Sequence, residues 1–417
     1  MPTYYLNSLS GDDASDGLSE LRPWRSLDRL SAFPAQPGDT FRLQGGVTFP
    51  GAIRWDWKGI GNGVVPITVG SYGTGSATIA SPPDQGAFLY TGLGGICLEN
   101  LTLKGRCSRY GASGATFGPT DGSDDNLANI VLKNLLVYGY GTAGVMLCGR
   151  DVDRPARNVS LEDCRFTRNG LGTYLWSVLG LKLLRCVGND NDGYPGNPGG
   201  NAGQGLTVYL GKDLLLEECR AERNGHRTPM AVGSAGIFLS ACQYLRAYRC
   251  WTADNGDQEK QDGQNLIVYG GNNNAIEKCS AIGGLAGFCL FHDRWSGGPV
   301  ERCRIIDSFA SGNVTDISIV GDVFDSLIAN NRVVCTGYKA LDIADSDGTT
   351  RRNVRIVGNE FELRGGQFLV EAVPGLTGVE GLTANGWHAT EAEPFFVRQR
   401  GYAKIGEALA AEPVGVL

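Results

Sequence analysis

The chain has 417 residues, which is too long for one ordinary globular core but normal for a single solenoid. Its net charge of −7 and the absence of a basic stripe argue against a nucleic-acid-binding protein. The 62 glycines, together with 42% hydrophobic residues, favour many turns joined by short strands and argue against disorder.

The N-terminal segment predicts a strand followed by a helix. Residues 1–5 lack the basic start and apolar core of a signal peptide, and no apolar stretch is long enough for a transmembrane helix. We therefore expect a secreted or periplasmic protein whose leader is absent from this chain, or a cytoplasmic one. Trp24, Leu27 and Leu30 have helical spacing, so residues 23–33 are predicted to form an N-terminal capping helix.

A short strand with alternating apolar residues recurs along the chain and ends each time in Cys or Asn. This column contains Asn100, Asn134, Cys164, Cys186, Cys219, Cys250, Cys279, Cys303, Asn331 and Asn359. A period of roughly 20 to 35 residues without helices is typical of a β-solenoid. The sequence therefore predicts an all-β fold, a right-handed parallel β-helix of roughly ten coils.

We expect this β-helix to be one domain over residues 1–385, with a cap over about residues 1–40 and a C-terminal tail or cap over 386–417. Residues 405–411 are predicted to form a short helix there. The Cys and Asn columns should form inward ladders, with the cysteines as buried free thiols. Disulfides are a weaker alternative, and metal binding is weaker still because the chain contains no Cys-x-x-Cys pair.

A second strand, usually opened by Gly, follows each Cys strand, and its third and fifth residues are predicted to face solvent. The third residues form a first outward column: Met146, Tyr174, Thr207, Phe238, Ile267, Cys289, Ser318 and Asp342. The fifth residues form a second outward column: Cys148, Trp176, Tyr209, Ser240, Tyr269, Phe291 and Val320.

Three segments carry a resemblance to a known superfamily: YYLNSLSGDDASDG (4–17), PWRSL (23–27) and PGD (37–39). They resemble the opening strand and cap of right-handed parallel β-helix carbohydrate-active enzymes, the group of pectate lyases, polygalacturonases and phage depolymerases. The ladder coils cover roughly residues 90–365. The resemblance implies a carbohydrate polymer or oligosaccharide as partner. The polygalacturonase and alginate-epimerase motifs are missing, so no catalytic residue carries over.

Loops and aromatic residues predict a sugar-binding groove on the outward face. Insertions 188–204, 223–235 and 254–264 precede the Gly-led strands, and loops 291–299, 321–326 and 344–352 follow them. They are expected to wall a groove, because long loops carry function more often than coils do. Its floor would hold the aromatic residues Trp176, Tyr209, Tyr269 and Phe291. Stacking of these rings for stability alone is the alternative.

The segment Phe291-His292-Asp293-Arg294-Trp295 concentrates the most chemical groups. His292 is a candidate acid/base, and Arg294 and Trp295 are candidate substrate-binding residues. Asp293, Asp322 and Asp345 are expected one or two strand spacings apart, a range that covers both carboxylate separations used by glycosidases. The alternative for each Asp is ordinary turn chemistry.

Other charged residues in the insertions could also contact substrate. Lys260 and Asp262 lie in the insertion before the Tyr269 strand, and His226-Arg227 could hold an acidic group. The stretch 189–193 (Asn-Asp-Asn-Asp-Gly) resembles part of a calcium loop without its full pattern. We expect no cofactor, with calcium as a possibility.

The carboxylate-rich face favours a glycoside hydrolase that uses a pair of Asp carboxylates. A polysaccharide lyase is the first alternative; it would need a base such as Lys260, Tyr269 or His292 and a cation such as Arg227 or Arg294. A non-catalytic adhesin is the second alternative, although it would not need clustered carboxylates.

Overall fold

The computed structural model describes residues 1–56, 60–119, 127–194, 203–227, 233–256, 263–293, 295–344, 350–365, 368–373, 377–389 and 396–397. The chain divides into two compact units, which are described separately. Unit 1 contains Met1–Lys212 and Arg227–Met230, and unit 2 contains Asp213–His226 and Ala231–Leu417. Within the described residues, no helix is long and apolar enough to cross a membrane.

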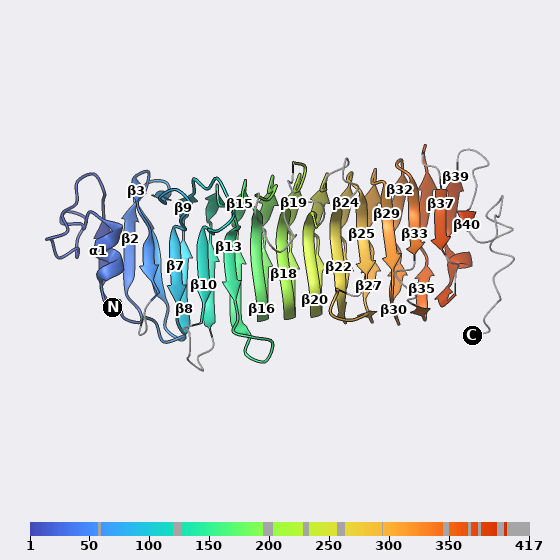
Figure 1. The fold of residues 1–417 in the computed structure, drawn as a ribbon, viewed down its shortest axis with the longest axis horizontal. Coiled ribbons are helices and arrows are strands. Elements are labelled where there is room, and N and C mark those ends of the chain that lie inside the picture. The colour runs from blue at the N-terminus through green and yellow to red at the C-terminus, as the bar shows by residue number, and fades with distance from the viewer. Residues whose placement is uncertain are drawn as a thin grey trace. The chain divides into compact units, whose positions relative to one another are not determined.

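Unit 1 is built from three stacks of parallel strands, each pairing with the equivalent strand one coil away (Figure 1). The first stack is β1 (Thr3–Leu6), β2 (Thr40–Gln44), β5 (Ile67–Tyr72), β8 (Gly94–Glu99), β11 (Ala128–Lys133), β14 (Ala156–Glu162) and the second half of β16 (Leu171–Leu184). The second is β4 (Ile53–Trp55), β7 (Phe88–Thr91), β10 (Ala115–Gly118), β13 (Ala143–Cys148) and the first half of β16. The third is β3 (Thr48–Pro50), β6 (Ala77–Ala80), β9 (Leu101–Lys104), β12 (Leu136–Tyr138), β15 (Arg165–Thr167) and β17 (Val187–Asn189).

Unit 2 repeats the same three-sided coil, and β18 (Gln204–Glu217) contributes residues to both units. Its first stack is the second half of β20 (Ala235–Tyr248), β23 (Ala275–Glu277), β27 (Arg304–Ile306), β31 (Leu327–Ala329), β35 (Val354–Val357) and β38 (Val379–Glu380). A row of short strands accompanies this stack and pairs in the order β26 (Val300–Glu301), β30 (Val323–Phe324) and β34 (Arg351–Arg352). The second is the first half of β20, β22 (Gln264–Asn272), β25 (Ala286–Phe291), β29 (Thr315–Val320), β33 (Lys339–Ala344), β37 (Phe368–Val373) and β40 (Phe396–Val397). The third is β19 (Arg220–Glu222), β21 (Trp251–Ala253), β24 (Ser280–Ile282), β28 (Phe309–Ser311), β32 (Arg332–Cys335), β36 (Glu360–Leu363) and β39 (Gly386–Ala389), preceded by the 3-10 turn η1 (Leu382–Ala384).

The predicted all-β fold of stacked parallel coils is confirmed within each unit. The third, short strand of each coil was not predicted, because three residues such as Arg165–Thr167 are too few to show an alternating pattern. The coil number, the handedness and the domain boundary at residue 385 remain predictions. β39 nevertheless pairs in register with β36, so the coil pattern continues to Ala389.

The predicted Cys and Asn column is right in part and needs two corrections. Asn100 and Asn134 do not occupy the inward ladder; both adopt left-handed backbone at the exposed corner between two strands, with φ of 55° and 48°. Asn tolerates that conformation better than most residues, so it marks the corner rather than the core. The inward positions are the next residues, Leu101 and Leu135.

Cys303 belongs to a different corner from Cys279. The backbone N–H of Arg304 donates to the carbonyl of Asn274, which aligns Cys303 with Asn274 rather than with Cys279. Cys279 instead aligns with Ser308, whose hydroxyl accepts its backbone N–H at 3.1 Å. The error arose because each coil has two similar corners, and residue spacing alone does not distinguish them.

The predicted N-terminal helix exists but is shorter than residues 23–33. The helix α1 runs over Leu27–Ala32 and begins at Ser26, whose hydroxyl accepts the N–H of Arg29. Trp24 is outside it, because its backbone pairs with β1 at Leu6 and its ring is buried. Whether α1 acts as a cap remains a prediction, and the predicted C-terminal helix at 405–411 lies outside the described residues.

Candidate functional site

The outward face of unit 2 has the register that the sequence predicted. The first outward column pairs Phe238 with Ile267, Ile267 with Cys289, Cys289 with Ser318, and Ser318 with Asp342. Each step is one strand, about 4.8 Å along the stack. The second outward column pairs in the same way beside it.

The prediction that the first column faces solvent is wrong for much of its length. Phe238, Ile267, Cys289 and Ser318 are all buried. Side chains stacked at the strand spacing shield one another, and the ring of Tyr269 in the second column packs against Phe238 at 5.6 Å. The face is therefore packed along the first column and partly open along the second.

The aromatic rings of the second column form a stack at one part of this face. The rings of Tyr269 and Phe291 are stacked with centroids 5.6 Å apart, and both residues are half-buried. Trp295 lies in the turn after β25 and is 75% exposed. Half-exposed and exposed rings offer apolar surface of the kind on which a sugar ring can lie.

Asp293 is held at the edge of this aromatic stack. Its Oδ1 accepts the Tyr269 hydroxyl at 2.5 Å and the backbone N–H of Trp295 at 2.8 Å. The Ser296 hydroxyl donates to its carbonyl at 2.8 Å. The carboxylate thus positions the Tyr269 ring and closes the turn that follows β25.

His292 faces Asp322 from the neighbouring coil. Its Nδ1 lies 3.5 Å from Asp322 Oδ2 and accepts the Asp322 backbone N–H at 3.3 Å. The same carboxylate accepts the N–H of Thr350 through Oδ1 at 2.5 Å. The structure therefore brings His292 and Asp322 together, a contact that the sequence analysis did not predict, and Asp322 is in contact through both carboxylate oxygens.

Some of the remaining predicted site residues lie in unit 1 or in unit 2, and the others lie outside the described residues. In unit 1, Trp176 and Tyr209 are half-buried, and Arg227 pairs with Asp192 at 3.1 Å. In unit 2, the ring of His226 contacts the carbonyl of Asp254 at 2.5 Å. The predicted substrate contacts Lys260, Asp262 and Arg294 and the predicted acid Asp345 all lie outside the described residues.

In the stretch 189–193, which resembles part of a calcium loop, polar side chains contact other protein groups. Asn191 is fully buried and its Oδ1 accepts the backbone N–H of Asn169 at 3.0 Å, while Asp192 pairs with Arg227. Among the described residues, no group of three or more His, Cys, Asp or Glu is arranged to hold a metal ion.

A compact charged cluster lies further along the same face, on β33 and β37. Lys339 Nζ donates to Asp342 Oδ1 at 2.8 Å and to Glu371 Oε2 at 2.6 Å. Asp342 and Glu371 are direct partners on neighbouring strands. Because both oxygens contact one nitrogen, their separation cannot exceed the sum of these two distances.

Burial makes this cluster electrostatically unusual. Only 15%, 16% and 10% of the Lys339, Asp342 and Glu371 side chains are exposed. Burial raises the pKa of Asp342, with Lys339 opposing the shift and Glu371 adding to it. Hydrogen bonds and charges of the two carboxylates raise the pKa of Lys339 against the effect of burial. The cluster thus holds a cation that resists deprotonation beside an acid that retains its proton to a higher pH than usual.

No family model matches the sequence. A lacto-N-biosidase of Bifidobacterium longum subsp. longum is 37% identical over 90 residues, which are 20% of this chain and only 6% of that protein. The structure resembles a GH136 lacto-N-biosidase from Eubacterium ramulus, with a TM-score of 0.53 and 16% identity over 80% of this chain and 64% of that one. It also resembles a mannuronic-acid-specific family 6 polysaccharide lyase from human gut microbiota, with a TM-score of 0.58 and 15% identity over 91% and 84% of the two chains. These likenesses confirm the predicted fold resemblance to parallel β-helix carbohydrate-active enzymes.

Of the three residues in the charged cluster, the sequence analysis placed only Asp342 and missed Lys339 and Glu371. Asp342 was placed correctly in the first outward column but was not singled out as a site residue. Glu371 was not assigned to either outward column, although β37 pairs it directly with Asp342. Lys339 was not assigned either; it is the first residue of β33, and the Lys-x-x-Asp spacing could have suggested its contact with Asp342.

Proposed function

We propose that the outward face of unit 2 hydrolyses a glycosidic bond of an oligosaccharide or polysaccharide, with Asp342 and Glu371 as its two carboxyl groups. The observation that carries this proposal is the pairing of these carboxyls on neighbouring strands around one lysine. Glycoside hydrolysis generally requires two carboxyl groups in different protonation states. The similarity to two lacto-N-biosidases supports the same class of reaction.

The two carboxyls take different roles. Asp342, whose pKa is raised by burial, would give its proton to the leaving glycosidic oxygen. Glu371 would attack the anomeric carbon to form a glycosyl ester, and Asp342 would then take a proton from the water that hydrolyses this ester. Lys339 would offset the negative charge of the two carboxyl groups and hold them in place through its two hydrogen bonds.

The separation of the carboxyls favours retention of anomeric configuration. Retaining glycosidases place the two groups about 5–5.5 Å apart, whereas inverting ones need about 6.5–9.5 Å to admit a water. Asp342 Oδ1 and Glu371 Oε2 lie 2.8 Å and 2.6 Å from the same nitrogen, so these two oxygens are closer together than the inverting arrangement requires. We therefore expect the initial product to have the configuration of the substrate.

A lyase is the second candidate, favoured by the likeness to the family 6 polysaccharide lyase. Its base would abstract a proton beside a uronate carboxylate. Lys339 is a poor choice for this role, because two carboxylates stabilise its protonated form. The Tyr269–Asp293 pair with His292 would be the lyase centre instead. A non-catalytic carbohydrate-binding protein is the third candidate.

The first test is a carbohydrate panel assayed for new reducing ends and for the ultraviolet absorbance of unsaturated sugars. We expect reducing ends without absorbance from the unmodified protein. Asp342→Asn and Glu371→Gln should each lower the rate by about 10²-fold or more, since acid–base groups contribute about 10²–10⁴-fold. Activity should also fall as pH rises through the raised pKa of Asp342, because the acid must be protonated.

Asp293→Asn and Asp322→Asn provide the matched comparison. If these variants lose activity while Asp342→Asn and Glu371→Gln keep it, the reaction belongs to the Asp293–His292–Asp322 group that the sequence predicted. Ultraviolet absorbance of the product would replace the hydrolase with the lyase. Saturable sugar binding without either product would leave a binding protein.

A further inference from the structure

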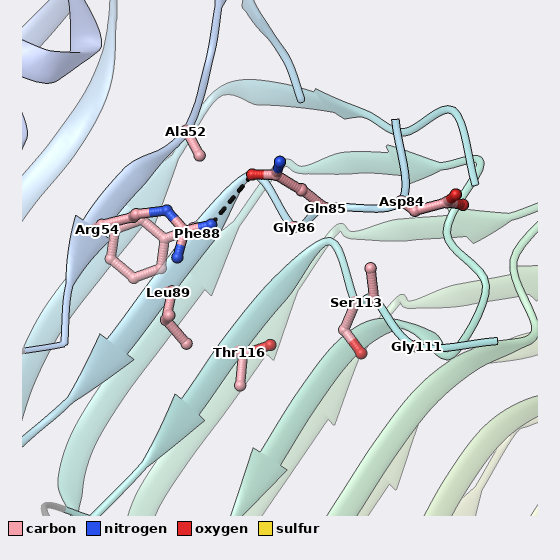
Figure 2. Close-up of a pocket in the computed structure, with 11 residues that line it drawn as sticks. Ala52, Arg54, Asp84, Gln85, Gly86, Phe88, Leu89, Gly111, Ser113 and Thr116 are labelled. Carbon is pink, nitrogen blue, oxygen red and sulfur yellow. Dashed lines mark hydrogen bonds between the residues drawn. The ribbon is translucent and has the colours of Figure 1, made fainter. Parts of the chain in front are cut away.

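Unit 1 has a hollow of about 250 Å³ on the outward side of β4, β7 and β10 (Figure 2). Arg54, Leu89 and Thr116 are direct partners on these three strands, so they form one outward column across its floor. The same column continues through Met146 to Tyr174. The hollow therefore lies in line with a row of outward side chains inside unit 1.

The wall of the hollow is built by two loops that hold each other in place. Asp84, which adopts left-handed backbone, accepts the backbone N–H of Ser108 at 3.0 Å. A Cβ placed on Gly86 would lie 2.5 Å from the carbonyl oxygen of Ser113, so only glycine allows this close approach. The cavity is thus preformed rather than a gap between loose loops.

Arg54 brings a positive charge to the hollow. Its guanidinium donates to the Gln85 side-chain oxygen at 3.2 Å, as Figure 2 shows, and Arg54 is exposed. Within the described residues, Arg54 makes no ion pair. Asp84 at the far side of the hollow has Arg109 3.6 Å away, so part of its negative charge is offset.

We propose that this hollow binds a sugar unit that carries a carboxylate, with Arg54 pairing with the carboxylate. A planar guanidinium matches a carboxylate with two parallel hydrogen bonds. Gln85 and Thr116 supply polar groups for sugar hydroxyls, and the side chain of Leu89 supplies apolar surface for the ring. The distance from Arg54 to Tyr174 is four strand spacings, roughly 19 Å, so a longer chain could reach the tyrosine.

This proposal does not depend on the proposed hydrolysis, because it concerns binding alone. It is tested on the Asp342→Asn variant of the full chain, in which turnover is expected to be blocked. The ligands are uronic acid oligosaccharides and the same oligosaccharides after reduction of their carboxyl groups to alcohols. Isothermal titration calorimetry gives the affinity of each.

We expect the acidic oligosaccharides to bind more tightly than their reduced forms. Arg54→Met in this background should weaken acidic ligands by about 10- to 100-fold, because hydrogen bonds to charged groups are worth more than neutral ones. Binding of the reduced ligands should not change. Added salt should weaken only the acidic ligands.

The control is Arg165→Met, which removes an exposed arginine on β15, outside the hollow. It should leave all affinities unchanged, and melting temperatures would verify that both variants fold. Equal affinity for acidic and reduced ligands, an Arg54→Met variant that binds as tightly as its parent, or no saturable binding would each overturn the proposal. If the unmodified protein hydrolyses no glycosidic bond but acid-selective binding is retained, the proposed function is refuted and this binding site still stands.

Discussion

The burial of Asp316 could not be predicted from the sequence. Asp316 is the second residue of β29 and was not singled out by the sequence analysis, yet its side chain is fully buried. Asn313 Nδ2 donates to its Oδ1 at 2.8 Å. Burial nevertheless dominates and raises the pKa of Asp316 to about 7. The environments of Asp342 and Glu371 likewise depend on a neighbouring coil, since these residues are direct partners on β33 and β37 and both contact Lys339.

The raised pKa of Asp316 predicts a pH-dependent stability. An acid whose pKa is higher in the folded state costs stability as pH rises from its unfolded value, about 4, to its folded value, about 7. The stability of the unmodified protein should therefore fall by a few kcal/mol across this window. Asp316→Asn should remove much of the fall in urea unfolding midpoints, whereas the exposed control Asp153→Asn should not. Parallel pH profiles for Asp316→Asn and the unmodified protein would refute this assignment.

At the scale of elements, the repeat period predicted the long strands, but residues could be assigned to the two corners of a coil only from the structure. A period of roughly 20 to 35 residues identifies one coil, and alternation assigns faces within a strand. Neither distinguishes the two corners of a coil, so Cys303 was assigned to the wrong one. A residue with positive φ, such as Asn330 or Gly358, precedes each inward position, but Arg302 before Cys303 has positive φ as well, so this feature marks both corners.

The asparagine ladder of unit 2 was predicted and is confirmed for its last coils. Asn331 Nδ2 donates to Asn359 Oδ1, and Asn359 Nδ2 donates to Asn385 Oδ1, each at 2.8 Å. Asn359→Ala would remove the acceptor of the buried Asn331 backbone N–H and the donor to the Ile328 carbonyl, and we expect a loss of about 2–4 kcal/mol in the free energy of unfolding. Asn353→Gly, at an exposed corner, should cost much less. Similar urea midpoints for the two variants would contradict a stabilising ladder.

For the whole molecule, composition and repeats were sufficient to predict stacked parallel coils, but only part of the candidate site. The outward columns and the contacts of His292 with Asp322 and of Tyr269 with Asp293 follow from register. Their degree of burial does not, because shielding depends on the sizes of side chains one and two coils away. Residue types therefore predicted which face could hold a functional site, and side-chain packing determined which carboxyl group has a shifted pKa.

The coils hold together without disulfides, and this has a measurable consequence for the whole chain. All 12 cysteines are free, and only Cys97, Cys107 and Cys148 are not fully buried. Burial raises the pKa of Cys97 and Cys148 to about 11, so few thiolates exist at neutral pH even at these sites. We expect slow labelling of the native protein by a thiol reagent, restricted to these three residues, and rapid labelling of all 12 cysteines after unfolding without reductant. A reducing agent should leave the melting temperature unchanged. Incomplete labelling of the unfolded, unreduced protein, or a lower melting temperature on reduction, would mean that disulfides join the coils and that stacking alone does not account for their stability.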